Sequence, residues 1–430
     1  MQYRLWTNVI LGLYLFLGLG YSLLVPVWEG PDEPAHYFYA LHIVWQGKPP
    51  PIEKDYEAYQ PSPYYWFASG PLWLLNRIDP RLVEYYLPPE RHFENVGKPA
   101  PVYAWNQQNF RVIWGVLILR WVNILLGLFA IRLIYLALDQ FYTNSKPLVL
   151  SSLSIAGLLP QFIHIMATVS NDAAAVLAGA FLFWLLGRLL AHSNEVRWNL
   201  MAVLAAISLP IVTKMTVLPM SLTVLLVTLV LSLRSRTEPP RKVLLAAGSL
   251  IIILVIPLVV IAPFRLEVLL SEIQWRGFYI RPDALTSAYM SRMVIQVVWS
   301  FWGRVGWLGA GLPGWIVGVL TALGLAGGLI SLKLITSDGI IERKFGKILW
   351  LAAALSILMV GKNGLNTPFN QGRFLFPALG VFSLLIMSGW ATLLPEKMHK
   401  YLPAAIVTGM VGLNLWMWLG VIIQVYFQPW

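Results

Sequence analysis

The sequence is poor in several residue types, and each shortage excludes a class of protein. It contains no cysteine, which excludes disulfide bonds, thiol catalysis, iron–sulfur clusters and cysteine-based zinc sites. Only 12% of its 430 residues are charged, against about 25% in a typical globular domain. Hydrophobic residues make up 58%. A set of water-soluble domains is therefore excluded, and the composition predicts an all-α protein that crosses a membrane several times.

Motifs for nucleotide-driven chemistry are also lacking. The sequence has neither a Walker-type G-x-x-x-x-G-K-[ST] element nor a G-x-S-x-G nucleophile elbow. No internal repeat is evident, which disfavours an inverted-repeat transporter. Any chemistry on this chain is therefore expected to use a substrate that is already activated.

Long apolar runs predict about eleven transmembrane helices, each of about 17 to 25 residues. They lie near Thr7–Val27, Val112–Leu138, Leu148–Ala167, Ala173–Leu190, Leu200–Val212, Thr216–Leu233, Val243–Pro263, Pro313–Leu334, Ile348–Val360, Phe374–Leu394 and Leu402–Tyr426. The first is interpreted as a signal anchor. The predicted organisation is a first span (1–27), an outer loop domain (28–111), spans two to seven (112–263), a second outer segment (264–312) and spans eight to eleven (313–430).

The distribution of basic residues predicts which side of the membrane each loop faces. With the N-terminus in the cytoplasm, the inner loops contain Lys146, Arg197, Arg234, Arg236, Arg241, Lys242, Arg343, Lys344, Lys347, Lys397 and Lys400. The short outer turns contain only Lys214, Lys362 and Arg373. This bias follows the positive-inside rule. It also accounts for the net charge of +11 without a nucleic-acid partner.

Acidic residues gather in the outer loop domain, which holds ten of the 20 Asp and Glu residues. Its most informative text is Glu29-Gly-Pro-Asp-Glu-Pro-Ala-His36. Pro34 and Gly47 are typical of the start and end of a helix, so Asp32 and Glu33 should lie at the N-terminus of a short outer helix. A carboxylate held there would be ionised and could act as a general base.

Two other interpretations of this text remain open. Asp32 could simply cap the helix, with Glu33 as an ordinary first-turn acid. His36 follows Glu33 by three residues, a spacing that could bind a divalent metal. The sequence offers no second such pair and no cluster of histidines, so no metal or other cofactor is expected.

A wider set of motifs, scattered in order over nearly the whole chain, points to a family. The motifs are Pro31-Asp-Glu-Pro-Ala-His-Tyr37, Gln60-Pro-Ser-Pro-Tyr-Tyr65, Val169-Ser-Asn-Asp172, Thr213-Lys214, Phe301-Trp-Gly303 and Gln371-Gly-Arg-Phe-Leu-Phe-Pro377. With them, the chain resembles the GT-C superfamily of membrane glycosyltransferases, within a largely uncharacterised multi-pass bacterial branch. The resemblance implies a GT-C-like fold whose large first outer loop carries short amphipathic helices.

The resemblance also implies a reaction. It assigns the role of catalytic base to Asp32, with Glu33 as its acidic neighbour, and the sugar donor is a polyprenyl phosphate or diphosphate. Transfer would occur on the outer face of the membrane with inversion. The chain ends soon after its last predicted span, so sequon glycosylation by a large outer domain is not expected.

Residues for substrate binding follow from the chemistry of such a donor. A departing lipid phosphate needs cations at the outer boundary, and Arg373, Lys214 and Arg304 are the candidates. The alternative for Arg373 and Lys214 is that each snorkels to the headgroups. The candidate contacts to the substrates are His36, Tyr64, Tyr65, Asn171, Asp172 and Gln371. Asp172 could equally cap a helix, and the tyrosines could anchor the loop at the membrane interface.

The sequence therefore predicts a glycosyltransferase in the plasma membrane of a bacterium, with its active site on the outer face. It would move one hexosyl or pentosyl group from a polyprenyl-phosphate carrier to a glycan, a glycolipid or a protein of the cell envelope. A transporter or flippase of a lipid-linked glycan is the main alternative, and a non-catalytic scaffold is another. The transporter would be expected to hold more charge within its spans than Arg120, Arg132 and Asp172 provide.

Overall fold

The computed structural model describes residues 2–52, 55, 57–84, 107–142, 145–192, 195–234, 279–336, 341–368 and 370–427. This part of the chain is almost entirely helical, as the composition predicts. Its strands, β1 (Arg304–Val305) and β2 (Ala310–Gly311), pair antiparallel in a short hairpin. The all-α fold class is therefore confirmed.

Eight helices or helical runs are long and apolar enough to cross a membrane. They are α1 (Gln2–Leu24), α4 (Gln107–Phe141), α7 (Asp172–Ala191), η4 (Met215–Val217) with α9 (Leu218–Arg234), α13 (Gly314–Ile330) with η5 (Ser331–Ile335), α14 (Arg343–Asn366), η6 (Gly372–Ala378) with α15 (Leu379–Leu393), and α17 (Leu402–Trp416) with η7 (Met417–Ile422) and α18 (Ile423–Tyr426). A ninth span exists if α5 (Lys146–Leu158) and α6 (Pro160–Met166) count as one.

The described residues thus support eight or nine spans where the sequence predicts eleven. The predicted span at Leu200–Val212 lies in α8 (Val196–Val212), which at 17 residues is shorter than the other spans. The predicted span at Val243–Pro263 lies outside the described residues. A length near the lower limit is the reason that α8 is ambiguous, because a tilted or partly buried helix needs more residues to cross a bilayer.

A proline explains the break in the third predicted span. Leu159 has an extended backbone, with φ −62° and ψ 122°, as expected for a residue before proline. Pro160 also has no N–H to continue the hydrogen-bond ladder of α5. The chain therefore turns by 55° and restarts as α6.

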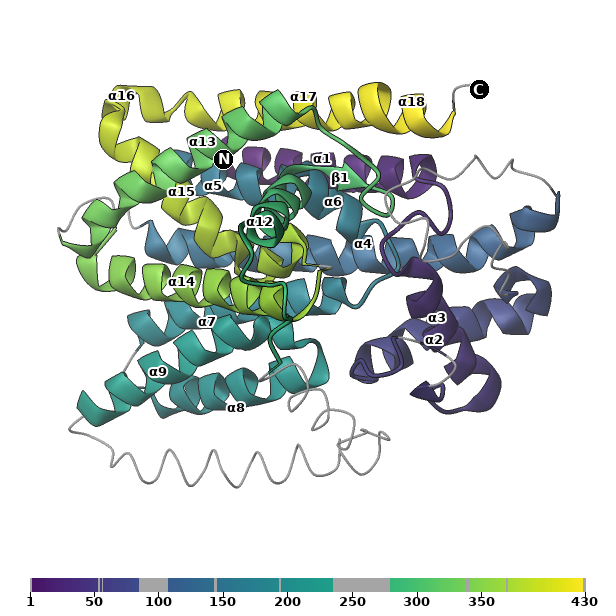
Figure 1. The fold of residues 1–430 in the computed structure, drawn as a ribbon. Coiled ribbons are helices and arrows are strands. Elements are labelled where there is room, and N and C mark those ends of the chain that lie inside the picture. The colour runs from purple at the N-terminus through teal and green to yellow at the C-terminus, as the bar shows by residue number, and fades with distance from the viewer. Residues whose placement is uncertain are drawn as a thin grey trace.

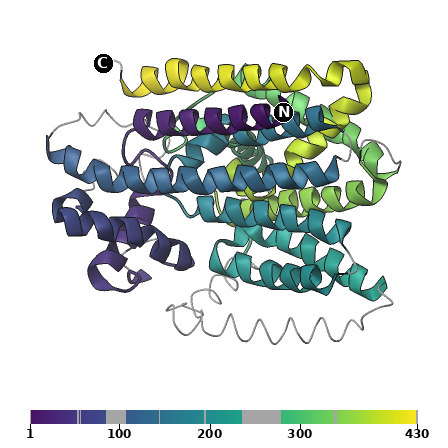
Figure 2. The ribbon, with the colours of Figure 1, turned by 180° about the vertical axis from the view of Figure 1, so that it is seen from behind.

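The long helices lie side by side in one stack, with α17 and α18 next to α1 in both views (Figures 1 and 2). One large hydrophobic core joins α1, α4, α5, α7 and α15. Packing of apolar helix faces against one another is expected to be the main source of stability. The short α16 (Glu396–His399) connects α15 to α17.

The predicted outer loop domain forms a separate lobe, called the outer lobe below, beside one end of α4 (Figure 1). It consists of α2 (Glu33–Gln46), α3 (Pro63–Ile78) and the 3-10 helix η2 (Pro80–Val83). Its own hydrophobic core includes Trp28, Tyr37 and Leu72 and is completed by Val116 and Leu119 of α4. As predicted, Pro34 lies in the first turn of α2. The helix ends just before Gly47, which has φ 63°.

The outer lobe also has an exposed apolar face on α3. The exposed side chains are Trp66, Phe67, Trp73, Leu74 and Ile78, with exposed fractions of 39% to 77%. Their spacing of seven and four residues places them on one side of the helix. This side is suited to the membrane interface, as expected of an amphipathic helix in the first outer loop.

A second outer element lies near the lobe. Helix α12 (Ser287–Trp302) begins at Thr286, whose hydroxyl accepts a hydrogen bond from the Tyr289 amide at 3.3 Å. The hairpin of β1 and β2 follows directly. The Trp307 indole on this hairpin donates to the Trp28 carbonyl at 3.0 Å. The second outer segment therefore contacts the loop that leads into α2.

Candidate active site

Asp32 lies immediately before α2 in an unusual backbone conformation. Its φ is 60° and its ψ is 8°, in the left-handed region, which Asp tolerates better than most residues. Within the described residues its side chain caps no backbone N–H. It instead accepts a hydrogen bond from Arg373 Nη2 at 2.7 Å. The interpretation of Asp32 as a simple helix cap is therefore wrong.

Arg373 connects Asp32 to a second carboxylate. Its Nη1 lies 3.2 Å from Asp172 Oδ2, and Asp172 Oδ1 is 2.6 Å from Lys214 Nζ. Asp32, Arg373, Asp172 and Lys214 thus form one ion-pair chain of alternating charge. Lys214 also donates to Asn171 at 3.1 Å.

The ion-pair chain is buried in its middle and partly exposed at both ends, with Asp32 as its most open end. The side chain of Asp32 is 24% exposed, against 4% for Arg373, 6% for Asp172 and 12% for Lys214. Each member lies at or just before the start of a helical element, namely α2, η6, α7 and η4. Helix N-termini favour anions, so the open end is suited to an anionic substrate next to a carboxylate base.

Glu33, the second predicted catalytic residue, lies in a different set of contacts from Asp32. Its side chain is fully buried and accepts two hydrogen bonds from Arg120, from Nε at 2.7 Å and from Nη2 at 2.6 Å. It also accepts from the amides of Trp28 and Val169, each at 3.0 Å. Both carboxylate oxygens are therefore occupied by donors, and these contacts tie Glu33 to three other parts of the chain.

Arg120 completes this contact and was missed as a site residue. It lies within the α4 span and is fully buried. Its remaining N–H groups donate to the carbonyls of Ser22 and Val25 at 2.7 Å and of Pro26 at 3.0 Å. Glu33 and Arg120, called the clamp below, thus tie α2 and the end of α1 to α4. A lone arginine inside an apolar run was the signal that could have revealed it.

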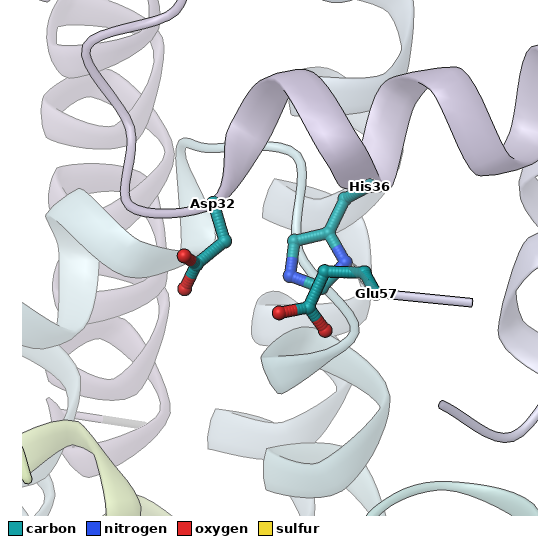
Figure 3. Close-up of side chains that lie close together, drawn as sticks. All are labelled: Asp32, His36 and Glu57. Carbon is teal, nitrogen blue, oxygen red and sulfur yellow. The ribbon is translucent and has the colours of Figure 1, made fainter. Parts of the chain in front are cut away.

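A second group of side chains meets Asp32 from the outer lobe. Asp32, His36 and Glu57 each offer a ligand atom, and these atoms lie within 4.8 Å of one another. Figure 3 shows the two carboxylates and the imidazole converging. His36 Nδ1 lies 2.7 Å from the Tyr65 hydroxyl, and Tyr39 stacks on Tyr65 with ring centroids 3.7 Å apart. Glu57 was missed, because no spacing links it to Asp32 in the sequence.

Burial keeps His36 and Glu57, which lie next to Asp32, uncharged near neutral pH. Burial, together with the positive charge of Lys214, lowers the pKa of His36 to about 3. Burial, followed by the nearby charge of Asp32, raises the pKa of Glu57 to about 8. Burial likewise raises the pKa of Asp55 to about 7. At pH 7 His36 is therefore neutral and Glu57 is protonated.

The three residues also fit a divalent cation. One imidazole nitrogen and two carboxylate oxygens are ligands that Zn²⁺ or Mn²⁺ accepts, with positions left open for a substrate. The Tyr65 hydroxyl on His36 Nδ1 would orient the ring for binding through Nε2. A cation would first have to displace the proton of Glu57 and compete with Arg373 for Asp32.

The other predicted contacts divide into two groups. Tyr65 touches His36, whereas the Tyr64 hydroxyl donates to Asn123 at 3.0 Å and lies deeper in the fold. Asn171 contacts Lys214 and donates to Gln60 at 3.0 Å. Gln371 lies just before η6, and its buried Oε1 accepts no hydrogen bond from a described residue. Tyr65 and Asn171 therefore contact members of the site, and Gln371 is close to Arg373 in the chain.

Arg304, predicted as a phosphate ligand, is not part of the ion-pair chain. Its guanidinium stacks on Trp299, 5.0 Å from the ring centroid, and its backbone N–H donates to Gln161. It forms no ion pair with any described residue, and burial lowers its pKa. The structure thus brings Arg373 and Lys214 together and leaves Arg304 on the neighbouring hairpin.

Comparison with known proteins gives an independent view of the chain. Residues 98–261 match the family model described as dolichyl-phosphate-mannose-protein mannosyltransferase. The matched range contains Arg120, Asp172 and Lys214 but ends before Arg373 and begins after Asp32. No curated protein matches the chain by sequence.

Two solved structures align with nearly the whole chain. The first is ArnT from Cupriavidus metallidurans bound to undecaprenyl phosphate, with 10% identity, a TM-score of 0.56, and coverage of 98% of this chain and 73% of that one. The second is an oligosaccharyltransferase from Archaeoglobus fulgidus tethered with an acceptor peptide, with 12% identity, a TM-score of 0.42, and coverage of 98% and 54%.

The family model and the alignment with ArnT agree with the resemblance found in the sequence motifs. The chain is a multi-pass membrane protein with the GT-C fold, the fold of the membrane glycosyltransferases.

Proposed function

We propose that the protein is a glycosyltransferase that moves one sugar from a polyprenyl-phosphate carrier to an acceptor on the outer face of a bacterial plasma membrane. The observation that carries the proposal is the contact of 2.7 Å between Asp32 and Arg373. It sets a partly exposed carboxylate beside a buried guanidinium. The first can accept a proton and the second can hold a phosphate. The undecaprenyl phosphate bound to ArnT supports a lipid-linked donor.

The proposed reaction is a single displacement at the anomeric carbon. Asp32 accepts the proton of the acceptor hydroxyl, and the acceptor oxygen bonds to the anomeric carbon. The bond between that carbon and the bridging phosphate oxygen breaks, and the electron pair leaves with the lipid phosphate. Arg373 and Lys214 stabilise the negative charge that develops there. Attack opposite to the leaving group inverts the anomeric configuration.

The residues around the ion-pair chain are proposed to bind the sugar. Neutral His36, Tyr65 and Gln371 offer hydrogen-bond donors and acceptors without adding charge, as sugar hydroxyls require. Aromatic rings such as Tyr65 also provide a flat apolar surface. The acceptor is a glycan, a glycolipid or a protein.

We propose that transfer does not need a divalent cation. Arg373 already supplies the positive charge at Asp32, and Glu57 is protonated near neutral pH. Should a cation take part, Asp32, His36 and Glu57 would hold it, and it would polarise a bound hydroxyl or phosphate oxygen.

The proposal is tested with purified protein, a panel of prenyl-phosphate sugars and cell-envelope extracts as acceptors. Formation of prenyl phosphate and of labelled product is followed by chromatography. Asp32→Asn is expected to abolish transfer, while Asp79→Asn is the matched control. Asp79 lies in the same outer lobe, pairs with Arg81 at 2.7 Å and is distant from the ion-pair chain in sequence and contacts. A parent protein that moves the donor across vesicles without cleaving it would establish a flippase instead.

A further inference from the structure

Arg373 uses only part of its hydrogen-bonding capacity. A guanidinium has five N–H donors, yet among the described residues only Nη2 makes a hydrogen bond, to Asp32. Nη1 faces Asp172 in an ion pair at 3.2 Å, and Nε is buried without a hydrogen-bond partner in the described chain. Buried donors are normally satisfied. The unused donors therefore point to a ligand that supplies acceptor oxygens.

The edge of Arg373 that such a ligand would use is already half occupied. Nε and Nη2 lie on the same edge of a guanidinium, and this edge binds phosphate with two parallel hydrogen bonds. Arg120 uses the same two nitrogens toward Glu33. On Arg373, Nη2 is held by Asp32. A phosphate that takes both nitrogens must displace Asp32 from Nη2.

Asp32 is the partner that can leave. Its side chain is 24% exposed, and Arg373 is its described ion-pair partner. Asp172, in contrast, is 6% exposed, is held by Lys214 at 2.6 Å, and has its backbone N–H bonded to Ser170. Asp172 therefore keeps Arg373 in place while Asp32 exchanges.

We propose that the donor phosphate exchanges with Asp32 on Arg373, so that Asp32 becomes available as a base only after the lipid-linked sugar has bound. The inference rests on the proposed function and adds an order to it, with the donor before the acceptor. In the free protein Asp32 Oδ2 is held against Arg373 Nη2, and release of this contact frees the carboxylate to turn toward the acceptor hydroxyl.

The exchange predicts that a variant without the Asp32 carboxylate binds phosphate more tightly than the parent. Asp32→Asn is suitable, because Asn tolerates the left-handed backbone. Asp32→Gly also fits this conformation and removes the side chain entirely. Each is titrated in detergent with EDTA present, using a short-chain prenyl monophosphate as the probe. Both variants are expected to bind about tenfold more tightly, since one charged hydrogen bond no longer has to be broken.

The matched control is Glu57→Gln. Glu57 belongs to the same group of converging side chains as Asp32, but no described hydrogen bond or ion pair joins it to Arg373. Both variants are titrated at the same pH, and what distinguishes the two positions is the contact of Asp32 with Arg373. If Glu57→Gln and Asp32→Asn raise the affinity for the prenyl monophosphate equally, the effect is one of general charge and the proposed exchange is wrong.

Inorganic phosphate serves as a second probe. If the exchange occurs at the phosphate, the Asp32 variants should bind inorganic phosphate more tightly than the parent by a similar factor. Tighter binding of the prenyl probe alone would assign the effect to the lipid chain and overturn the proposal. The two proposals also fail separately. An Asp32→Asn protein that loses transfer without binding phosphate more tightly rejects the exchange but keeps the base. Retained transfer in that variant rejects the base itself.

Discussion

Arg373 contacts two carboxylates and is proposed to bind the donor phosphate as well. Arg373→Lys is expected to reduce transfer on the order of 100-fold, because an ammonium cannot span Asp32 and Asp172 or bind phosphate with two parallel hydrogen bonds. Initial rates with a lipid-linked donor test this. Thermal unfolding in detergent should show whether the fold is retained.

Arg132→Lys is the matched control for this change. Arg132 also lies in a membrane helix, but it stacks on Tyr135 at 5.0 Å and is not part of the ion-pair chain. Its replacement should leave transfer near the parent rate. Parent-like transfer by Arg373→Lys would move the phosphate role to Lys214 or Arg304.

The raised pKa of Glu57 predicts how the stability and the transfer rate change with pH. Its folded-state pKa is about 8, against an ordinary value of 4.5. The folded state therefore holds a proton that the unfolded state releases over this interval, so stability falls as the pH rises from about 4.5 to about 8. Transfer should also decline above about pH 8, since an ionised Glu57 repels the anionic donor.

Glu57→Gln removes the titrating group and should flatten both profiles. Melting temperatures and transfer rates at intervals between about pH 5 and pH 9 compare the two proteins. A parent and variant that respond identically to pH would show that Glu57 does not titrate in this range.

The position of a single residue in the fold could be predicted when neighbouring residues in the sequence indicated the local structure. Asp32 was identified because Pro34 and the first span fix its place. Its contact with Arg373 was not, since 341 residues separate them and no local pattern encodes such a distance. The roles of Asp32 and Glu33 were also inseparable in sequence, because adjacent residues at a helix start differ only in the direction that each side chain takes.

At the scale of elements, the clamp between Glu33 and Arg120 joins three helices. Glu33→Gln leaves a buried guanidinium without its counter-charge, which typically costs about 3 to 5 kcal/mol. We expect a lower melting temperature and a lower yield of folded protein, together with weaker transfer. Asp32→Asn should instead lose transfer with little change in melting temperature. Unfolding followed by intrinsic fluorescence separates the two variants.

A double replacement checks that the clamp acts through charge. Changing Glu33 and Arg120 together to Met removes both charges and should recover part of the stability that Glu33→Gln loses. If Glu33→Gln is as stable as the parent yet inactive, Glu33 acts in the chemistry and the sequence-based assignment stands.

The elements themselves followed the sequence closely where the signals were strong. Pro34 and Gly47 set the limits of α2, and Pro160 accounts for the break between α5 and α6. The sequence predicted one straight span there, because hydropathy averages over a proline that apolar residues surround. The hairpin of β1 and β2 was not predicted, since two-residue strands have no periodicity to detect.

At the scale of the whole molecule, the proposed chemistry is independent of a divalent cation. Transfer is expected to persist in EDTA at close to the rate without it. The measurement uses protein dialysed against chelator and then supplied with Mg²⁺, Mn²⁺ or Zn²⁺. Loss of activity on chelation and recovery with one of these ions would assign the cation to Asp32, His36 and Glu57. His36→Gln should then lower the affinity for that ion.

The overall architecture was predictable because the membrane limits what a chain can form. Composition and apolar runs gave the helical class, and the motifs gave the GT-C resemblance. The predicted number of eleven spans is not confirmed, because α8 lies near the shortest length that can cross a bilayer and the predicted span at Val243–Pro263 lies outside the described residues. The convergence of four helix starts on one point could not be predicted, since it depends on how the helices pack.

The left-handed backbone at Asp32 restricts which residues this position can hold. Side chains other than Gly, Asn and Asp pay a conformational cost there, so Glu is not a conservative replacement even though it keeps the carboxylate. It would add a methylene to the reach of the acid and strain the turn that aims it. Random mutagenesis at this codon should therefore recover well-folded protein mainly with Asn or Gly, and active protein with Asp alone.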